Sequence, residues 1–257
     1  FLSLGLMFNR ENVAQAQADF AENRYCVIDN VLQDRYIRAL YRAVPKLEYG
    51  AWGCIRNSHD RYPHSFLQSE KLQDTIWAHV EEGRGEFSYW HYAYWLEQDK
   101  HKRHDSHEVT YFNRVVTEDY SIGKPDYTFH DLVSEVTQFP NMMTKQPTYS
   151  YYDYQSWLKA HNDPRRWCAY IFYFNETWEP HWGGQLCIMD ESERTIKESI
   201  IPYGNRLVIM DVSELLRQRM NYHFISPVSI TADHPRYSLA GWFYQKDGDG
   251  ASPINSQ

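Results

Sequence analysis

The second half of the chain is a series of short strand-like runs with no helical pattern between them. From about residue 148, runs rich in β-branched, aromatic and aliphatic residues alternate with turn residues. These runs are 148–154, 167–175, 185–190, 206–211, 222–229 and 237–245. Several short strands without intervening helices indicate a sandwich or barrel.

The first half has a different pattern, dominated by helix formers. Residues 10–20 favour a helix, 25–32 form a strand-like run, and apolar residues within 32–44 recur at helical spacing. Two further segments, 69–82 and 130–137, also predict helices. The expected fold class is therefore mainly β with supporting α, a β core packed by N-terminal helices.

Nothing in the sequence divides the chain, so we expect residues 1–257 to form a single domain. Within it, 10–145 would give helical support and a lid or pocket wall. Residues 146–246 would form the β core, and the Gly/Asp/Ser-rich residues 247–257 a loose tail.

Charge and cysteine usage narrow the class of partner and the location. The formal net charge is -8 and no long Lys/Arg run is present, which argues against nucleic acid and anionic membrane as partners. No stretch approaches the roughly 20 apolar residues of a spanning helix. The cysteines are scattered without a CxxC spacing, which predicts a reducing, cytoplasmic location. They are Cys26, Cys54, Cys168 and Cys187.

The stretch "LKAHNDPRRW" (158–167) places a histidine two residues before an aspartate. Side chains at i and i+2 of an extended segment share a face, so His161 and Asp163 can present a nitrogen and an oxygen to one point. With a second histidine they would make the facial triad of non-haem Fe(II) oxygenases. His223, on a late strand-like run, is the expected third ligand. Asn-Asp-Pro is also good turn chemistry, so a polar turn is the simpler alternative.

Other candidates lie near these residues. His181 beside a Gly-Gly turn is the rival metal ligand, although a loop role fits it better. Arg236 at the start of the last strand-like run is suited to a bidentate grip on a carboxylate. Arg166 is a solvated arginine or a second anion-binding group.

Several motifs in order carry a resemblance to a known family. They are "HND" (161–163), "YFNETW" (173–178), "GGQLCIMD" (183–190), "PYGNRLVIMD" (202–211), "YHFISPVS" (222–229) and "RYSLAGWF" (236–243). Together with "YCVIDNVLQDRYIRALYRAV" (25–44), they resemble the prolyl-4-hydroxylase-like branch of the 2-oxoglutarate/Fe(II)-dependent dioxygenases. The resemblance spans about residues 20 to 245. The segment "ITADHP" (230–235) makes the gap between His223 and Arg236 longer than is usual in the family.

This resemblance implies a double-stranded β-helix (jelly-roll) core with Fe(II) held by His161, Asp163 and His223. It also implies 2-oxoglutarate as co-substrate held by Arg236, O₂ as the other co-substrate, and ascorbate as a reductant. Family members use a tyrosine of the first core strand to touch the oxo-acid. Tyr149, Tyr151, Tyr152 and Tyr154 compete for that role, and Tyr149 and Tyr151 are preferred.

The expected function is hydroxylation of an unactivated C–H bond in a small molecule such as an amino acid or natural-product intermediate. A carboxylate ligand favours hydroxyl transfer over halogenation, whereas desaturation, epoxidation and cyclisation need the same ligands. The aromatic segment 85–145 favours an enclosed substrate. The alternatives are a hydroxylase of a peptide or protein side chain, a non-catalytic jelly-roll binding module and a cupin-type metalloenzyme.

Overall fold

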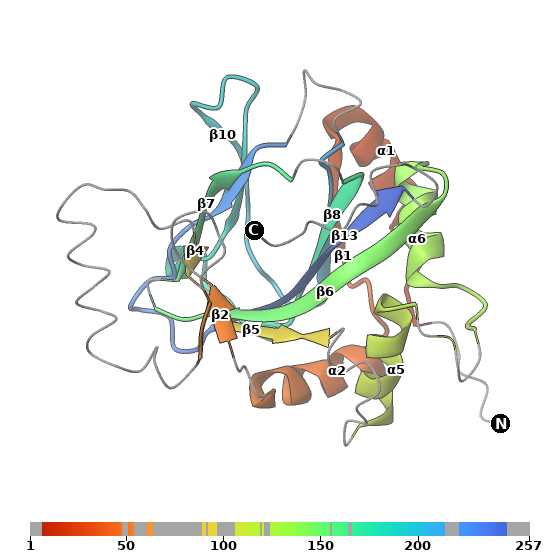
Figure 1. Ribbon diagram of the computed structural model, residues 1–257, viewed down its shortest axis with the longest axis horizontal. Helices are drawn as coiled ribbons and strands as arrows, with labels where there is room; N and C mark the ends of the chain where they lie inside the picture. The colour runs from red at the N-terminus through yellow and green to blue at the C-terminus, as the bar shows by residue number, and fades with distance from the viewer. Residues whose placement is uncertain are drawn as a thin grey trace.

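Two antiparallel sheets form the centre of the molecule (Figure 1). The computed structural model describes residues 7–47, 51–53, 61–63, 89–90, 92–96, 106–118, 120, 124–154, 156–163, 166–213 and 221–245. The larger sheet has the order β1-β11-β8-β13-β6-β5-β2-β3, and the smaller has the order β10-β9-β12-β7-β4. From β6 to β13 the chain crosses from one sheet to the other at every connection except that between β9 and β10, which pair with each other in the smaller sheet. This is the strand arrangement of a jelly roll, so the predicted double-stranded β-helix fold is confirmed.

The strands have the following bounds. The larger sheet contains β1 (Tyr25–Asp29), β2 (Ala51–Gly53), β3 (Arg61–Pro63), β5 (Tyr92–Trp95), β6 (Met142–Tyr152), β8 (Cys168–Tyr173), β11 (Arg206–Asp211) and β13 (Arg236–Gln245). The smaller sheet contains β4 (Tyr89–Trp90), β7 (Trp157–His161), β9 (Leu186–Met189), β10 (Ile196–Ile200) and β12 (His223–Ile225).

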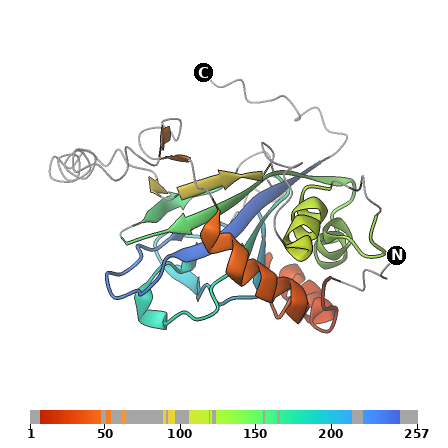
Figure 2. The same cartoon turned by 90° about the horizontal axis from the view of Figure 1, so that it is seen from below.

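The outer face of the larger sheet is covered by helices. They are α1 (Val13–Asn23), α2 (Asp34–Ala43), α5 (His107–Val116) and α6 (Phe129–Thr137), with a short 3₁₀ turn η1 (Val44–Lys46) after α2. Figure 2 shows them together on one side of the strands. Their apolar side chains share one core cluster with strand residues such as Tyr170, Phe172 and Phe243. Phe129 of α6 packs on all three of these rings, 4.8 to 5.4 Å between centroids. We call this surface the helical face.

The space between the sheets holds a second core cluster, which we call the barrel interior. β8 shows how one strand supplies both faces. Tyr170 and Phe172 belong to the helical-face cluster, whereas Ile171 and Tyr173 belong to the interior. Because successive side chains of a strand point to opposite faces, a strand covered on both sides needs an unbroken apolar run. This explains the sequence "CAYIFYF" and the burial of every β8 residue.

Several expected elements are confirmed. The strand-like runs correspond to β1, β6, β8, β9, β11, β12 and β13, and the patterns of 10–20, 32–44 and 130–137 to α1, α2 and α6. β6 begins earlier than expected, at Met142, and β12 ends at Ile225, shortly before Pro227. The predicted helix 69–82 and the predicted tail 247–257 lie outside the described residues.

Sequence reasoning missed the short strands β2, β3, β4, β5 and β7, the outer strand β10 and the helix α5. β10 is an outer strand of its sheet whose first four residues are exposed, so its sequence "IKESI" lacks apolar alternation. α5 begins at His107, the last residue of the charged stretch 99–107. Ser106 caps its N-terminus by accepting a hydrogen bond from the Val109 N–H, 3.4 Å.

The described residues of the stretch 85–145 lie in two places, outside the larger sheet and within the two sheets. α5 and α6 belong to the helical face and support the sheet from outside. β4 pairs with β7 in the smaller sheet, and β5 pairs with β6 in the larger sheet. The two neighbouring aromatic strands β4 and β5 therefore contribute to both sheets. The predicted lid or pocket wall can therefore involve β4 and β5, whereas α5 and α6 provide the predicted helical support.

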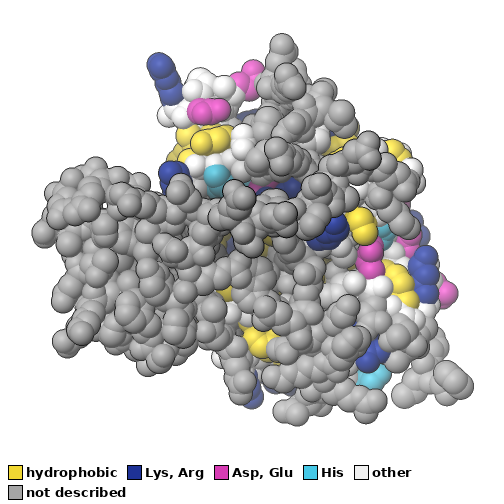
Figure 3. Space-filling model, in the orientation of Figure 1, with side chains coloured by type: hydrophobic (Ala, Val, Ile, Leu, Met, Phe, Trp, Pro, Cys, Tyr) yellow, Lys and Arg dark blue, Asp and Glu magenta, His cyan; other side chains and the backbone are white. Residues whose placement is uncertain are grey.

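Among the described residues, no helix is long and apolar enough to cross a membrane. Where described side chains reach the surface in Figure 3, basic and acidic groups lie interspersed on the same face.

Candidate active site

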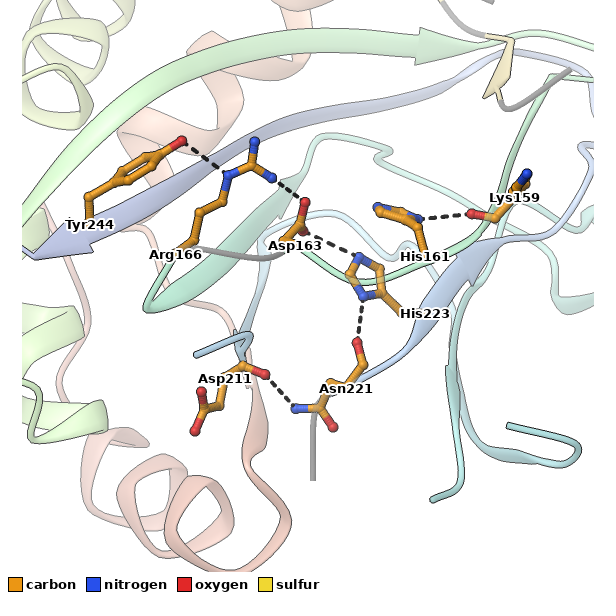
Figure 4. Close-up of polar contacts among 8 residues, drawn as sticks. All are labelled: Lys159, His161, Asp163, Arg166, Asp211, Asn221, His223 and Tyr244. Atoms are coloured by element: carbon orange, nitrogen blue, oxygen red, sulfur yellow. Dashed lines mark hydrogen bonds and ion pairs between the residues drawn. The ribbon is translucent and has the colours of Figure 1, made fainter. Parts of the chain in front are cut away.

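Three predicted ligands meet between neighbouring strands of the smaller sheet (Figure 4). His161 ends β7, Asp163 follows two residues later, and His223 begins β12. His223 and His161 are direct partners in the antiparallel pairing of these strands. One ligand atom from each of the three residues lies within 4.8 Å of the others. Two imidazoles and one carboxylate on one side of a point form the facial triad that leaves positions open for co-substrates.

Backbone carbonyl groups set the orientation of both imidazole rings. Nδ1 of His161 lies 2.9 Å from the Lys159 carbonyl oxygen, and Nδ1 of His223 lies 2.8 Å from that of Asn221. A carbonyl oxygen only accepts, so each Nδ1 carries the proton and each Nε2 has its lone pair free. Outer partners of this kind fix metal-binding histidines in the correct tautomer. The donor set therefore fits a divalent metal ion.

Burial and charge prepare the ligands for metal binding. Burial lowers the pKa of His223, the His161 charge adds to the effect, and Asp163 opposes it. Burial raises the pKa of Asp163, but the charges of His223, His161 and Arg166 outweigh it, so the net shift is downward. Neutral imidazole and ionised carboxylate are the forms that bind a metal ion.

Asn221 ties the His223 end of the triad to the edge of the larger sheet. Its side-chain amide donates to the carbonyl oxygens of Arg24, 2.7 Å, and Asp211, 3.1 Å. Arg24 and Asp211 also form an ion pair. The carbonyl that orients His223 therefore belongs to a residue held by two hydrogen bonds, of which Figure 4 shows the one to Asp211.

Arg166 contacts the triad directly. Its Nη1 donates to Oδ1 of Asp163, and its Nε donates to the Tyr244 hydroxyl, 3.1 Å. The guanidinium also lies over the Trp242 ring, 4.0 Å from the centroid. The alternative of a solvated arginine is wrong, since the side chain is only 19% exposed.

Arg236 lies in the barrel interior at the first position of β13, with no exposed surface. Nη1 donates to the Ser238 hydroxyl, 3.2 Å, and Nη2 to the Tyr173 hydroxyl, 3.4 Å. The guanidinium lies over the rings of Tyr152 and Tyr173, 4.7 and 4.9 Å from their centroids.

No carboxylate among the described residues pairs with Arg236, and its Nε has no hydrogen-bond partner there. An isolated buried charge is costly unless it is paired. The residues present therefore fit a ligand carboxylate, which would supply the missing partner.

The tyrosines preferred from the sequence lie elsewhere. Tyr149 is fully buried in the helical-face cluster, where its hydroxyl donates to Asn113, 2.7 Å, and burial raises its pKa. Tyr151 packs against the same cluster, with its ring 6.0 Å from Tyr237. The structure does not bring either of them to Arg236, which contacts Tyr152 and Tyr173 instead. The sequence signal that could have identified Tyr173 is the run "YIFYF" (170–174). Strand alternation places Tyr173 on the opposite face from Tyr170 and Phe172.

A glycine pair completes the wall beside Arg236. A Cβ on Gly184 would lie 3.0 Å from Cδ of Arg236 and 3.2 Å from the Trp178 ring. A Cβ on Gly183 would meet the Pro227 carbonyl oxygen at 2.1 Å. Both glycines have positive φ. His181, the rival metal ligand, is exposed in the 3₁₀ turn η4 (Pro180–Trp182) and is not part of the triad cluster.

Comparison with known proteins agrees with this geometry. Residues 147–244 match the model of the 2OG-Fe(II) oxygenase superfamily. No curated protein matches the chain. Among solved structures, a Pseudomonas putida prolyl-4-hydroxylase is similar over 91% of this chain and 98% of its own, with a TM-score of 0.56 and 17% identity.

Two further solved structures are similar at the level of the fold. A Trichoplax adhaerens prolyl hydroxylase, in complex with a hypoxia inducible factor peptide fragment, has a TM-score of 0.60 and 16% identity, over 96% of each chain. A non-heme alpha ketoglutarate dependent epimerase from nogalamycin biosynthesis has a TM-score of 0.54 and 10% identity, over 92% of this chain and 84% of its own.

The fold and the triad together define a non-haem Fe(II) enzyme. Residues 147–244, which include the triad and Arg236, match the 2OG-Fe(II) oxygenase superfamily, and this match together with the triad implies Fe(II) and 2-oxoglutarate as cofactor and co-substrate. The predicted enzyme class is thereby confirmed.

Proposed function

We propose that this oxygenase hydroxylates an unactivated C–H bond of a small molecule, such as an amino acid or natural-product intermediate. In this proposal His161, Asp163 and His223 hold Fe(II), and Arg236 binds the distal carboxylate of 2-oxoglutarate. The observation that carries it is the pairing of a facial triad with a fully buried arginine that has no carboxylate partner among the described residues.

Bound Fe(II) and 2-oxoglutarate together supply the oxidising chemistry, which consumes O₂ and releases succinate and CO₂. The protein supplies orientation. Arg236 and the Tyr173 hydroxyl would fix one end of the oxo-acid, with Ser238 on the other side of the guanidinium. Tyr173 is therefore our candidate for the tyrosine that touches the oxo-acid, in place of Tyr149 and Tyr151.

The substrate would approach on the His161 side of the triad. His161 is partly exposed, whereas Asp163 and His223 are buried. β4 and β5, separated by a single residue, extend the two sheets next to β7 and β6. Because the polypeptide passes from one sheet to the other at this edge, it would help to enclose a substrate, which favours a small molecule over a peptide or protein.

A peptide or protein side chain is the second candidate. The partial exposure of His161 favours it, since a polymeric substrate must reach the iron from the surface. Two of the similar structures are prolyl hydroxylases and one is an epimerase from nogalamycin biosynthesis. Because the same fold serves both substrate classes, fold likeness does not separate them.

The first test of the proposal is anaerobic cofactor binding. Fe(II) and 2-oxoglutarate are added to the protein without O₂, and the weak visible metal-to-ligand charge-transfer band is recorded. The parent is expected to give the band, Asp163→Ala to lose it, and Arg236→Ala to need far more oxo-acid. Arg10→Ala serves as the control, since Arg10 pairs with Glu135 of α6 and stacks on Tyr127. No band in the parent at saturating Fe(II) and oxo-acid would overturn the proposal.

Substrate class is then tested by succinate release. Free amino acids and small natural-product intermediates are compared with proline-containing peptides at equal concentration. Release coupled to a small molecule supports the first candidate, and release coupled only to peptides supports the second.

A further inference from the structure

The two oxygens of the Asp163 carboxylate have different neighbours. Oδ1 accepts a hydrogen bond from Nη1 of Arg166, whereas Oδ2 lies 3.7 Å from Nε2 of His223. Figure 4 shows the carboxylate between the guanidinium on one side and the imidazoles on the other. Only Oδ2 therefore faces the point where the ligand atoms of the triad converge.

Arg166 is itself held from three directions. Besides Asp163, it contacts Tyr244 through Nε, 3.1 Å, and the Trp242 ring, 4.0 Å from the centroid. Trp242 and Tyr244 are two residues apart on β13, so they present side chains on one face of the strand. A planar guanidinium that is stacked and hydrogen-bonded at two edges has little freedom to turn.

The number of oxygens that Asp163 gives to the iron matters for the co-substrates. A facial triad with a monodentate carboxylate leaves three positions of an octahedral metal open. A 2-oxo acid chelating through two atoms fills two of them, and O₂ needs the third. A bidentate carboxylate would occupy one of these positions.

We propose that Arg166 is a positioning residue that occupies Oδ1 of Asp163 and so keeps this carboxylate a one-oxygen ligand. Trp242 and Tyr244 hold Arg166 in the orientation that this needs. The inference rests on the proposed function, since it takes the triad as the metal site. It adds a role to residues that neither bind the metal nor touch the oxo-acid.

The test counts metal-bound water molecules instead of measuring turnover. Mn(II) is bound anaerobically in place of iron, and water-proton relaxation is measured for the parent, Arg166→Met and Arg10→Met. Arg10 is a matched control because it also pairs with a carboxylate and stacks on a tyrosine ring, but on the helical side of the molecule.

Arg166→Met is expected to lower the relaxation enhancement per bound Mn(II) by about a third, as three open positions become two. It should also weaken Mn(II) binding about 10-fold or more, as loss of an outer partner does. Arg10→Met should match the parent in both. Unchanged relaxation in Arg166→Met, with or without weaker Mn(II) binding, would overturn the proposal.

Tyr244→Phe provides a second route if Arg166→Met does not fold. It keeps the guanidinium and removes only the acceptor for its Nε. We expect a smaller fall in relaxation than for Arg166→Met, and parent-like relaxation would count against the proposal. Failure of the proposed function has a different signature, because the parent itself would then bind neither Mn(II) nor 2-oxoglutarate.

Discussion

The two ends of β13 each place an arginine against aromatic rings, but the two arginines have opposite electrostatic surroundings. Arg236 lies over Tyr152 and Tyr173 with no carboxylate partner among the described residues, whereas Arg166 lies over Trp242 and is paired with Asp163. A charge paired within the protein helps to hold a site together. An unpaired one calls for a ligand from outside, so the contrast distinguishes a structural arginine from a binding arginine.

The largest expected effect is the loss of oxo-acid binding when the unpaired arginine is removed. Arg236→Met should weaken 2-oxoglutarate binding at least about 100-fold, since two charge-assisted hydrogen bonds contribute roughly 1.5–3 kcal/mol each. Calorimetric titration of the Mn(II)-loaded protein measures this. Mn(II) affinity should stay near that of the parent, because Arg236 is not a ligand. Equal loss of both affinities would mean that the variant has damaged the whole site.

The same comparison predicts opposite changes in the stability of the metal-free protein. Arg166→Met leaves the buried Asp163 carboxylate without its partner and should lower the free energy of unfolding by about 1–3 kcal/mol. Arg236→Met removes an unpaired buried charge and should leave that free energy unchanged or raise it. Urea unfolding of the two variants without metal measures both. A large loss in Arg236→Met would show that its charge is already compensated inside the fold.

The stability of the metal-free protein should also depend on pH, through the buried triad residue His223. The pKa of His223 is lowered by burial, and the unfolded value is near 6.5. The unfolded state therefore binds more protons below pH 6.5, so the metal-free protein should lose stability as the pH falls from that value toward the folded pKa. The pKa of Asp163 is lowered from 3.8, so its own contribution is lost only in more acidic solution.

Unfolding in urea at a series of pH values measures this loss, with His223→Gln as the matched variant. The variant should have a shallower decrease than the parent between pH 6.5 and 5. Parallel curves would show that His223 does not cause the loss.

The smallest expected effect concerns the wall beside Arg236. Gly184→Ala would bring a methyl group within 3.0 Å of Cδ of Arg236 at a residue with φ of +64°. The strained backbone should cost about 1 kcal/mol of stability. A displaced guanidinium should also weaken 2-oxoglutarate binding several-fold, with Mn(II) affinity unchanged. Parent-like binding of the oxo-acid would mean that Arg236 can shift without loss.

Much of the site could be predicted because its signals are local. His161 and Asp163 are two residues apart, and the order of the later motifs identified His223 and Arg236. The strand pattern after residue 148 also predicted the class of fold. β10 was missed because an exposed outer strand needs no apolar alternation, and α5 because its buried face is decided by the helices and sheet that it packs against.

The tyrosines show where sequence reasoning ends. Alternation separates Tyr149 and Tyr151 from Tyr152, but it does not say which face will be covered by helices and which will enclose the barrel interior. Packing places Tyr149 on the helical face and Tyr152 beside Arg236. A shift of the strand register by one residue would exchange the two faces of β6. The burial of the two core clusters sets that register, so a preference among tyrosines read from the local sequence has little weight.

The sequence by itself determined the chemical types of the site and their spacing along strands, because a period of two is a property of the extended backbone. Only the tertiary structure decided which charges would be paired. Asp163 and Arg166 are three residues apart, yet the position of the guanidinium depends on Trp242 and Tyr244 from the last strand. Likewise, Arg236 lacks a carboxylate among the described residues because two sheets close around it, which no local pattern encodes.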